Sequence, residues 1–311
     1  ASSNTQLTHP KAILVATNLS DLHRLMPFAL QMAIETDARL QLLHVLPMTV
    51  ELAPNVAWMP YYDREGAFSD AKNMLEPWCE HARKLGLQCT VLVRKSQPIA
   101  REIIQLVHQI HPDRLIIGTR SLGKLGRLLL GSVAEQVLCS VDLPVFTVGP
   151  EAHLVRESIG RQSTVLFATT LGEGHQANAA LACQLAVSHK ARLTILHVLS
   201  ASSQKDGGAD ALFLTIVDEL HQLAHKIEVD SCTTVDIKVA HGNPAVEILE
   251  EASASHARLI VMGSNDYSVF DHIARDRTIC KVLAHARCPV LTLHGSTAPR
   301  SENKSALVAS T

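Results

Sequence analysis

Short apolar runs alternate with longer amphipathic segments along most of the chain, and this alternation predicts the fold. Apolar runs of strand length lie near residues 12–17, 38–45, 89–94, 114–118 and 144–148. Segments whose apolar positions have helical spacing lie near 22–37, 65–85, 98–111 and 132–139. Helices between successive strands predict an α/β fold, with a five-stranded, parallel, doubly wound sheet covered by helices on both faces. Such a sheet binds ligands at the carboxyl ends of its strands, where the strand order reverses.

The same pattern occurs twice. AILVATNLS at 12–20 matches TVLFATTLG at 164–172, ARLQLLHVLP at 38–47 matches ARLTILHVLS at 191–200, and PVFTV at 144–148 matches PVLTL at 289–293. We therefore predict two tandem domains of this class. Their predicted bounds are 1–149 and 162–294, with a linker at 150–161 and a disordered tail at 295–311.

Composition excludes several classes of protein. The 311 residues carry a formal net charge of -2, their Lys and Arg form no run of five or more, and only 4% are aromatic. We therefore expect no nucleic-acid partner. No apolar run approaches the roughly 20 residues that span a bilayer, so we expect no membrane insertion. Seven scattered cysteines without a CxxC pair and a start, ASSNTQLTHP, without a signal-peptide pattern favour a reducing, cytoplasmic location.

The chain lacks the motifs of several common α/β enzymes. It has no GxxxxGK[ST], no GxGxxG after the first strand of either half, no GxSxG and no HIGH or SGGxDS signature. His221 and His225 are four residues apart on a predicted helix, but no Glu or third ligand accompanies them. His108 and His111 are typical of a helix end, where the dipole favours a cation. We predict no metal site and no catalytic residue.

The connection after the fourth strand of the first half carries a candidate anion site. Gly118 ends an apolar strand, and Gly131 and Ser132 open the next helix. Backbone N–H groups at such a strand-to-helix junction bind anions, and glycine allows close approach. The connection contains three bases and no acid, namely Arg120, Lys124 and Arg127. The alternative is that the glycines only make turns and the bases face water.

These landmarks resemble the universal stress protein family, whose nucleotide-binding members carry GxxGx9G[ST] after the fourth strand. The resemblance covers about residues 10–150 and 162–294. It implies that the first half binds ATP or a related adenine nucleotide, with Mg²⁺ accompanying the phosphates. Three of the four signature positions match, since Gly118, Gly131 and Ser132 are kept and Ser121 stands where the second glycine belongs. The predicted cofactor-binding residues are Ala16, Thr17, Asn18, Val45, Ile117, Gly118, Ser121, Gly131, Ser132, Val133 and Ala134.

The first half departs from the family pattern at further positions. Asn18 replaces a frequent Asp, and Ser96 replaces the glycine of a GxP turn. The second half departs more strongly.

There the signature positions hold Gly263, Asp266, Asp276 and Arg277, and Thr170 stands where the first half has Asn18. A carboxylate about 4 Å from a phosphate charge costs ~4 kcal/mol near a protein surface, whereas an exposed helix N-terminus contributes about 0.3–1 kcal/mol. We therefore expect no nucleotide in the second half.

The resemblance also implies how the halves associate. Family domains commonly dimerise through their last strands, so we expect PVFTV and PVLTL to pair within the chain. A homodimer of the whole chain stays open. The connection at 46–65 is interpreted either as a lid or partner surface, or as a loop packed on its own domain.

Two functional hypotheses follow. The first is an ATP-binding protein that acts in stress response and signalling, with slow hydrolysis at most. The second is a nucleotide-free interaction module that regulates partner proteins.

Overall fold

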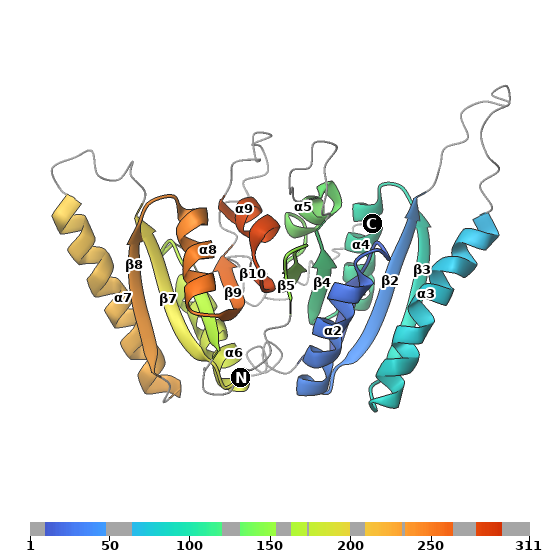
Figure 1. Ribbon diagram of the computed structural model, residues 1–311, viewed down its shortest axis with the longest axis horizontal. Helices are drawn as coiled ribbons and strands as arrows, with labels where there is room; N and C mark the ends of the chain where they lie inside the picture. Colours follow the sequence, from blue (N-terminus) through green and yellow to red (C-terminus); the bar gives the residue numbers. More distant parts are fainter. Residues whose placement is uncertain are drawn as a thin grey trace, which may run out of the picture.

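The computed structural model describes residues 10–47, 64–119, 131–153, 163–172, 174–199, 209–231, 234–263 and 278–293 (Figure 1). The predicted linker, the tail and the segment at 48–63 lie largely outside these residues. In the first half the strands are β1 (Ala12–Ala16), β2 (Arg39–Pro47), β3 (Cys89–Ser96), β4 (Arg114–Gly118) and β5 (Val145–Val148). The helices are α2 (Leu22–Thr36), α3 (Arg64–Lys84), α4 (Ile99–Ile110) and α5 (Ser132–Leu138). The predicted alternation is confirmed.

The second half repeats this order. Its strands are β6 (Thr164–Ala168), β7 (Arg192–Leu199), β8 (Val235–His241), β9 (Ala257–Gly263) and β10 (Val290–Leu293). Its helices are α6 (His175–Ser188), α7 (Ala209–Ser231), α8 (Pro244–Ala254) and α9 (Thr278–His285). Local chemistry sets some of these bounds. Asn243 accepts hydrogen bonds from the N–H groups of Ala245 and Val246, and Pro244 occupies the first turn, so α8 begins there.

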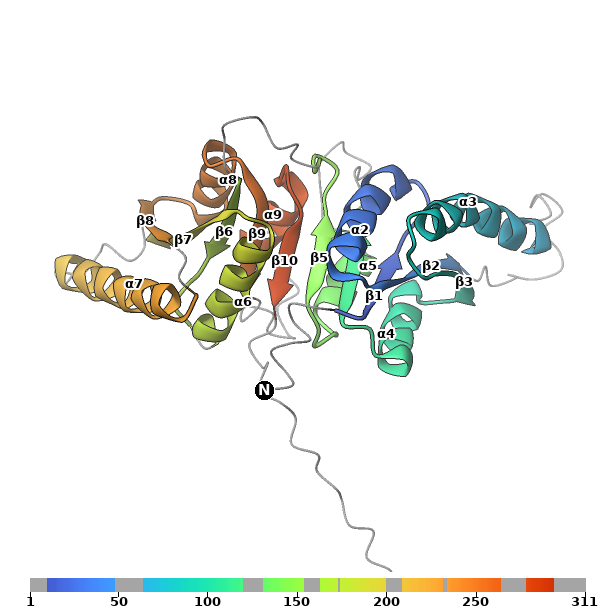
Figure 2. The same cartoon turned by 90° about the horizontal axis from the view of Figure 1, so that it is seen from below.

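All ten strands form one sheet, in the order β3-β2-β1-β4-β5-β10-β9-β6-β7-β8. Each half is a parallel sheet whose strand order reverses between its first and fourth strands, as the doubly wound fold requires. β5 and β10 pair antiparallel at the centre, with Phe146 opposite Leu291. The expected pairing of the last strands is therefore present, and it makes the combined sheet mixed. Figure 2 shows β5 and β10 side by side between the two sets of helices.

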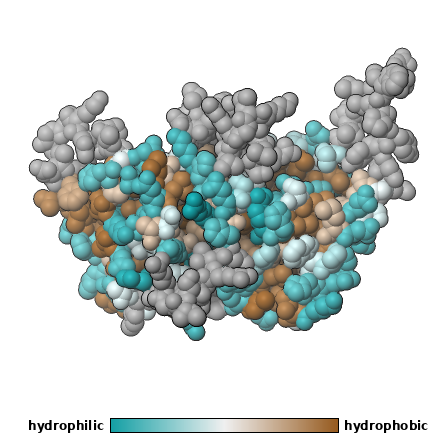
Figure 3. All heavy atoms as spheres, viewed as in Figure 1, coloured by the Kyte–Doolittle hydropathy of each residue, from teal (hydrophilic) through white to brown (hydrophobic). Residues whose placement is uncertain are grey.

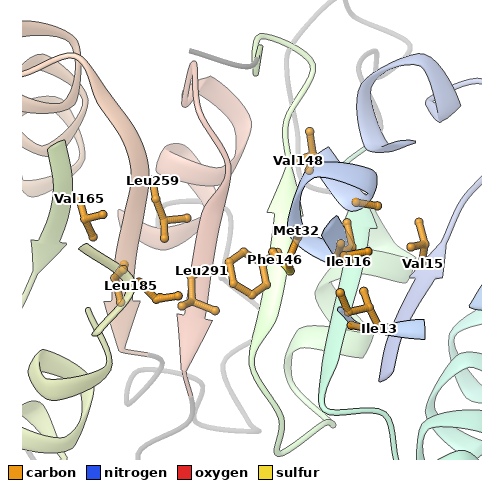
Figure 4. Packing of buried hydrophobic residues seen from close by; sticks show 14 of the residues in the cluster. Ile13, Val15, Met32, Ile116, Phe146, Val148, Val165, Leu185, Leu259 and Leu291 are labelled. Atoms are coloured by element: carbon orange, nitrogen blue, oxygen red, sulfur yellow. The ribbon is translucent and has the colours of Figure 1, made fainter. Parts of the chain in front are cut away.

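The helices cover the two faces of this sheet in the same way in both halves. One apolar cluster contains buried residues of α2, α3, α6 and α7, and the other contains buried residues of α4, α5, α8 and α9. Both clusters therefore run across the junction between the halves. In Figure 4, Leu291 and Phe146 lie next to each other, with Leu185 and Leu259 on one side and Met32 and Ile116 on the other. The halves share their core.

Phe146 is the largest apolar side chain at this junction. It is 2% exposed, and its ring lies 5.6 Å from that of Phe28 and 5.4 Å from the guanidinium of Arg114. Burial lowers the pKa of Arg114 to about 10, against the opposing charges of Asp113 and Glu35, so the guanidinium stays charged at neutral pH. A cation over an aromatic ring adds to the packing of Phe146.

A cluster of polar side chains from both halves lies beside the same junction. Glu35 Oε2 of α2 lies 3.1 Å from His189 Nδ1, and Glu35 Oε1 lies 3.9 Å from a guanidinium nitrogen of Arg258. Burial raises the pKa of Glu35, but the nearby His189, the hydrogen bond from Gln31 and the charge of Arg258 outweigh it, so the pKa lies below its ordinary value. The acid of one half is thus held by bases of the other.

Two further features bear on the expectations from sequence. Among the helices of the described ranges, none combines the length and the apolarity needed to cross a bilayer. The cysteines, which show no pairing pattern in the sequence, include one joined pair, Cys79 of α3 and Cys89 of β3.

We expect Phe146→Ala to lower the free energy of unfolding by about 3–5 kcal/mol, because it removes a packed aromatic side chain and leaves a cavity. Urea denaturation measures this loss. Phe146→Leu, which places the side chain of the paired Leu291 in β5, is the control and should cost about 1–2 kcal/mol. A calorimetric profile in which the second half unfolds in Phe146→Ala at its unchanged temperature would contradict a shared core.

Candidate functional site

The turn after β1 lies at the carboxyl edge of the sheet, beside the point where the strand order reverses. Thr17 N–H donates to the carbonyl of Leu43 in β2, and Ala16 pairs with Ile117 in β4. The turn therefore lies between the ends of β2 and β4. Asn18 is exposed, and its Oδ1 accepts from Ser20 Oγ at 2.8 Å. The structure thus places Thr17 and Asn18 at the edge where the sequence predicts a ligand.

A hydrogen-bonding arrangement holds the backbone of this turn, and the second half repeats it. Leu19 has φ 72° and donates its N–H to Thr17 Oγ1 at 2.9 Å, and Leu171 has φ 59° and donates to Thr169 Oγ1 at 3.0 Å.

A histidine on the neighbouring strand completes this hydrogen-bonding arrangement. Nδ1 of His44 lies 2.9 Å from the Thr17 carbonyl, and Nδ1 of His197 lies 2.9 Å from the Thr169 carbonyl. Burial lowers the pKa of His197, which favours the neutral ring as a donor. Sequence reasoning missed this role, although LHV stands at the same place in both halves.

Most apolar residues of the predicted site form its floor. The side chains of Ala16, Val45, Ile117 and Ala134 are between 3% and 7% exposed and belong to the apolar cluster on the α4 and α5 face, against which Val133 also packs. The structure therefore brings these five residues together from β1, β2, β4 and α5. These residues belong to the buried core, so a ligand at this edge would contact the end of the core.

Gly118 makes room for an acid of its own chain. Side chains alternate along β4, so that Ile116 joins the α2 face, Ile117 joins the opposite face and Gly118 turns back toward α2. There a methyl group on Gly118 would overlap the carboxylate of Asp21. The sequence interpretation gave this glycine either to the ligand or to a turn. The contact with Asp21 gives it a second, structural reason.

Asp21 is a buried acid that sequence reasoning missed. It is 2% exposed, and its Oδ1 accepts from Thr17 Oγ1 at 2.5 Å. Burial raises the pKa of Asp21, although the hydrogen bond from Thr17 and the charge of Arg24 act in the opposite direction. Asp21 also precedes α2 without capping it. A pairing of this acid with Gly118 joins positions 97 residues apart, so no local pattern could reveal it.

The first turn of α5 lies across from this group. Its N-cap residue Gly131 has φ -69° and ψ 144°, and no side chain caps the helix within the described part of the chain. Among the described residues, no side chain therefore accepts from the first N–H groups, including that of the exposed Ser132. Ser121 and the bases Arg120, Lys124 and Arg127 lie outside the described residues.

The second half keeps the strand-end glycine but surrounds it differently. A methyl group on Gly263 would lie 3.1 Å from Nδ2 of Asn178, a buried amide of α6. The positions Asp266, Asp276 and Arg277 lie outside the described residues, so the predicted loss of the second loop stays a prediction.

The remaining sequence candidates fall elsewhere. Ser96 ends β3, paired with Pro47. His221 and His225 are exposed on α7, and the described residues contain no group of three or more side chains suited to a metal ion. His111 adopts a left-handed conformation at the end of α4.

Comparison with known proteins agrees with the fold. The model of the universal stress protein family matches residues 10–149 and again residues 163–294. The chain therefore belongs to the universal stress protein family. It carries two family domains in tandem, and their last strands pair within the chain.

Individual relatives are distant. Universal stress protein MJ0531 of Methanocaldococcus jannaschii is 29% identical over 146 residues, which is 44% of this chain and 81% of that protein. The structure of a universal stress protein from Archaeoglobus fulgidus DSM 4304 superposes with a TM-score of 0.65 at 19% identity, covering 92% of this chain and 98% of that one. Protein PA1789 of Pseudomonas aeruginosa PAO1 gives a TM-score of 0.64 at 16% identity, covering 93% and 94%. These structures support the fold alone.

We expect Gly118→Ala to lower the free energy of unfolding by about 1–3 kcal/mol, because the added methyl group displaces the Asp21 carboxylate. Asp21→Ala removes that clash, so the same glycine substitution should cost much less in the Asp21→Ala background. Urea denaturation of the two single variants and the double variant measures the coupling. Equal costs of Gly118→Ala in both backgrounds would contradict the contact.

The buried Asp21 carboxyl also predicts a pH dependence. Its folded pKa is raised, so the native protein gains stability from this group as pH falls through that pKa. Asp21→Asn, which keeps the acceptor for Thr17, should therefore be more stable than the native protein at pH 7 to 8. The difference should shrink toward the ordinary carboxyl pKa of about 4. Thermal denaturation across this range measures it, and a difference that grows on acidification would contradict the assignment.

Proposed function

We propose that the first half binds ATP or a related adenine nucleotide at the carboxyl edge between β1 and β4, and that occupancy of this site is a signal in the stress response. The observation that carries the proposal is the meeting of Thr17, Asn18 and Gly118 at the point where the strand order reverses. Open α/β sheets bind nucleotides at such points. Of the family signature positions, Gly118 ends β4, and Gly131 and Ser132 lie at the start of α5.

The site offers separate surfaces to the two parts of a nucleotide. The apolar ends of β1, β2 and β4, with Val45 and Ile117, give a floor on which adenine can lie. The uncapped first turn of α5 offers N–H groups to phosphate, and Ser132 adds a hydroxyl. We therefore place the adenine near the end of β2 and the phosphates near the start of α5.

The Asp21 carboxylate limits where phosphate can lie. It is held by Thr17 and turned against Gly118, away from solvent. A second negative charge beside it is unfavourable, so we place the phosphates on the Gly131 side of the edge. Buried in this way, Asp21 does not reach a metal ion at the surface. Mg²⁺, which neutralises phosphate charge, would be held by the phosphates themselves together with exposed groups such as Ser132.

We propose that the site binds the nucleotide and hydrolyses it slowly at most. Activation of the attacking water would need a general base. We assign none among the described residues of this edge, because His44 is hydrogen-bonded to the Thr17 carbonyl and Asp21 accepts from Thr17 Oγ1. The second half is proposed to bind no nucleotide, since its sequence places Asp266 and Asp276 at signature positions.

A regulatory interaction module without nucleotide is the second candidate, and one surface favours it. The outer helix α7 exposes Phe213, Leu214 and Val229, with Leu214 66% and Val229 65% exposed. Figure 3 shows hydrophobic residues at the left end of the molecule, over α7. Phe213 and Leu214 are neighbours near the start of α7, and exposed apolar side chains that adjoin each other favour a protein contact.

Binding of ATP to the purified chain tests the proposal. Nucleotide released by denaturation is identified first, and the nucleotide-free protein is then titrated with ATP and Mg²⁺ by calorimetry. We expect about one site per chain. Gly131→Asp, which gives the first half the residue of the second, should weaken binding about 100-fold or more, because a carboxylate near phosphate costs ~4 kcal/mol and each 1.4 kcal/mol is tenfold.

Gly131→Asp is a clean test because Gly131 has an extended backbone that any residue adopts. Ser140→Asp is the matched control: it adds the same charge at an exposed position just beyond the other end of α5, and it should leave affinity unchanged. Absence of binding at millimolar ATP would leave the interaction module. Two equal sites would overturn the assignment of the second half.

A further inference from the structure

Two buried cysteines meet where α3 packs on the outer strand β3. Cys79 and Cys89 are joined through their sulfurs, and their Cα atoms are 5.3 Å apart, well within the range of protein disulfides. Cys79 is fully buried and Cys89 is 5% exposed. Both therefore also pack as small apolar side chains when reduced, so the fold accommodates either redox state.

A cation lies against this pair. A terminal guanidinium nitrogen of Arg83 lies 3.5 Å from Cys79 Sγ and donates to the Cys89 carbonyl at 2.9 Å, and Arg83 Nε donates to the same carbonyl at 3.2 Å. The other terminal nitrogen pairs with Glu76 at 2.8 Å, which fixes the guanidinium in place. A guanidinium beside sulfur stabilises the thiolate, which is the form that reacts with oxidants.

Other described cysteines have different surroundings. Burial raises the pKa of the Cys288 thiol to about 12 and also raises that of Cys183, and no cation is among the causes acting on either thiol, whereas Arg83 lies against Cys79. Within the described residues, the second half has no equivalent pair. In β8, Val235 takes the register position of Cys89, since Leu193 pairs with Val235 as Leu40 pairs with Cys89. The pair is therefore particular to the first half and is not required by the fold.

We propose that Cys79 and Cys89 form a reversible redox site for hydroperoxides, with Arg83 as its positioning residue. The Cys79 thiolate attacks the peroxide oxygen, the O–O bond breaks, and the products are a sulfenic acid and hydroxide, or an alkoxide from an organic peroxide. The Cys89 thiolate then attacks the sulfenic sulfur, forming the S–S bond and releasing hydroxide. In sum, two thiols and one hydrogen peroxide give one disulfide and two waters. Two equivalents of a small thiol reverse the step by exchange: the first forms a mixed disulfide, and the second releases it, leaving both cysteines as thiols and the small thiols as a disulfide.

The position of the pair gives this chemistry a structural effect. β3 is an outer strand of the ten-stranded sheet, hydrogen-bonded to β2 alone within the described residues. The disulfide joins the first residue of β3 to the last turns of α3, ten residues earlier in the chain. Oxidation therefore ties α3 to the outer strand and restricts their opening, while reduction leaves only packing and the hydrogen bonds of Arg83.

Peptide mapping of the full chain tests the proposal directly. The reduced, desalted protein is treated with hydrogen peroxide, quenched with catalase, denatured, blocked with a maleimide and digested with trypsin. The two cysteines fall in separate peptides, NMLEPWCEHAR at 73–83 and LGLQCTVLVR at 85–94. We expect these peptides to be cross-linked after oxidation and separate after treatment with dithiothreitol. Hydrogen exchange of α3 should be slower in the oxidised protein.

Four variants separate the proposal from incidental oxidation. Cys89→Val, which adopts the residue of the second half, should fold and give no cross-link, and Cys79→Ala should do the same. Arg83→Gln should slow cross-linking by peroxide several-fold, and Arg83→Lys, which keeps the positive charge, should restore most of the rate. Blocked thiols on both peptides after peroxide treatment would overturn the proposal. So would unchanged rates in Arg83→Gln or a cross-link that dithiothreitol does not release from the folded protein.

Discussion

The antiparallel pairing of β5 with β10 is the contact on which the whole arrangement depends. It is short, with Val145, Phe146 and Thr147 opposite Thr292, Leu291 and Val290. Yet it joins two parallel sheets into one and makes both apolar clusters continuous across the halves. Pairing within one chain has a further effect: the partner strand is always present, so no second molecule has to be captured. The strands that would otherwise be free edges are thereby covered.

The antiparallel junction also brings different side chains of the two halves into contact. Phe146 faces Leu291, and Glu35 of α2 is held by His189 and Arg258 of the second half. A symmetric dimer would repeat every such contact twice. In a covalent pair the two sides are free to diverge, so one side supplies the large ring and the acid while the other supplies the smaller side chain and the bases. The same freedom is what the proposed ligand site in the first half alone requires.

The sequence predicts the elements well because hydrophobic periodicity depends on local spacing. Every strand and helix expected in the first half is present within a few residues, and the pairing of PVFTV with PVLTL follows from two apolar strands at equivalent ends of a repeat. The sequence also groups Ala16, Val45 and Ile117, which meet in one cluster, while their part in ligand binding stays a prediction. The contact of Asp21 with Gly118 and the joining of Cys79 to Cys89 could not, because each depends on which side chains two packed elements turn toward each other.

Comparison of the two halves separates what the fold needs from what a ligand needs. The left-handed leucine after the first strand, the threonine hydroxyl that accepts its N–H, and the histidine that holds the threonine carbonyl occur in both. They are present whether or not the half has a complete signature loop, so they serve the strand-to-helix turn. The signature and turn positions that differ include Asn18 against Thr170, Ser121 against Asp266, Gly131 against Asp276, and Ser132 against Arg277. Since the shared hydrogen bonds already account for the shape of the turn, we expect the proposed difference in ligand binding between the halves to come from these side chains.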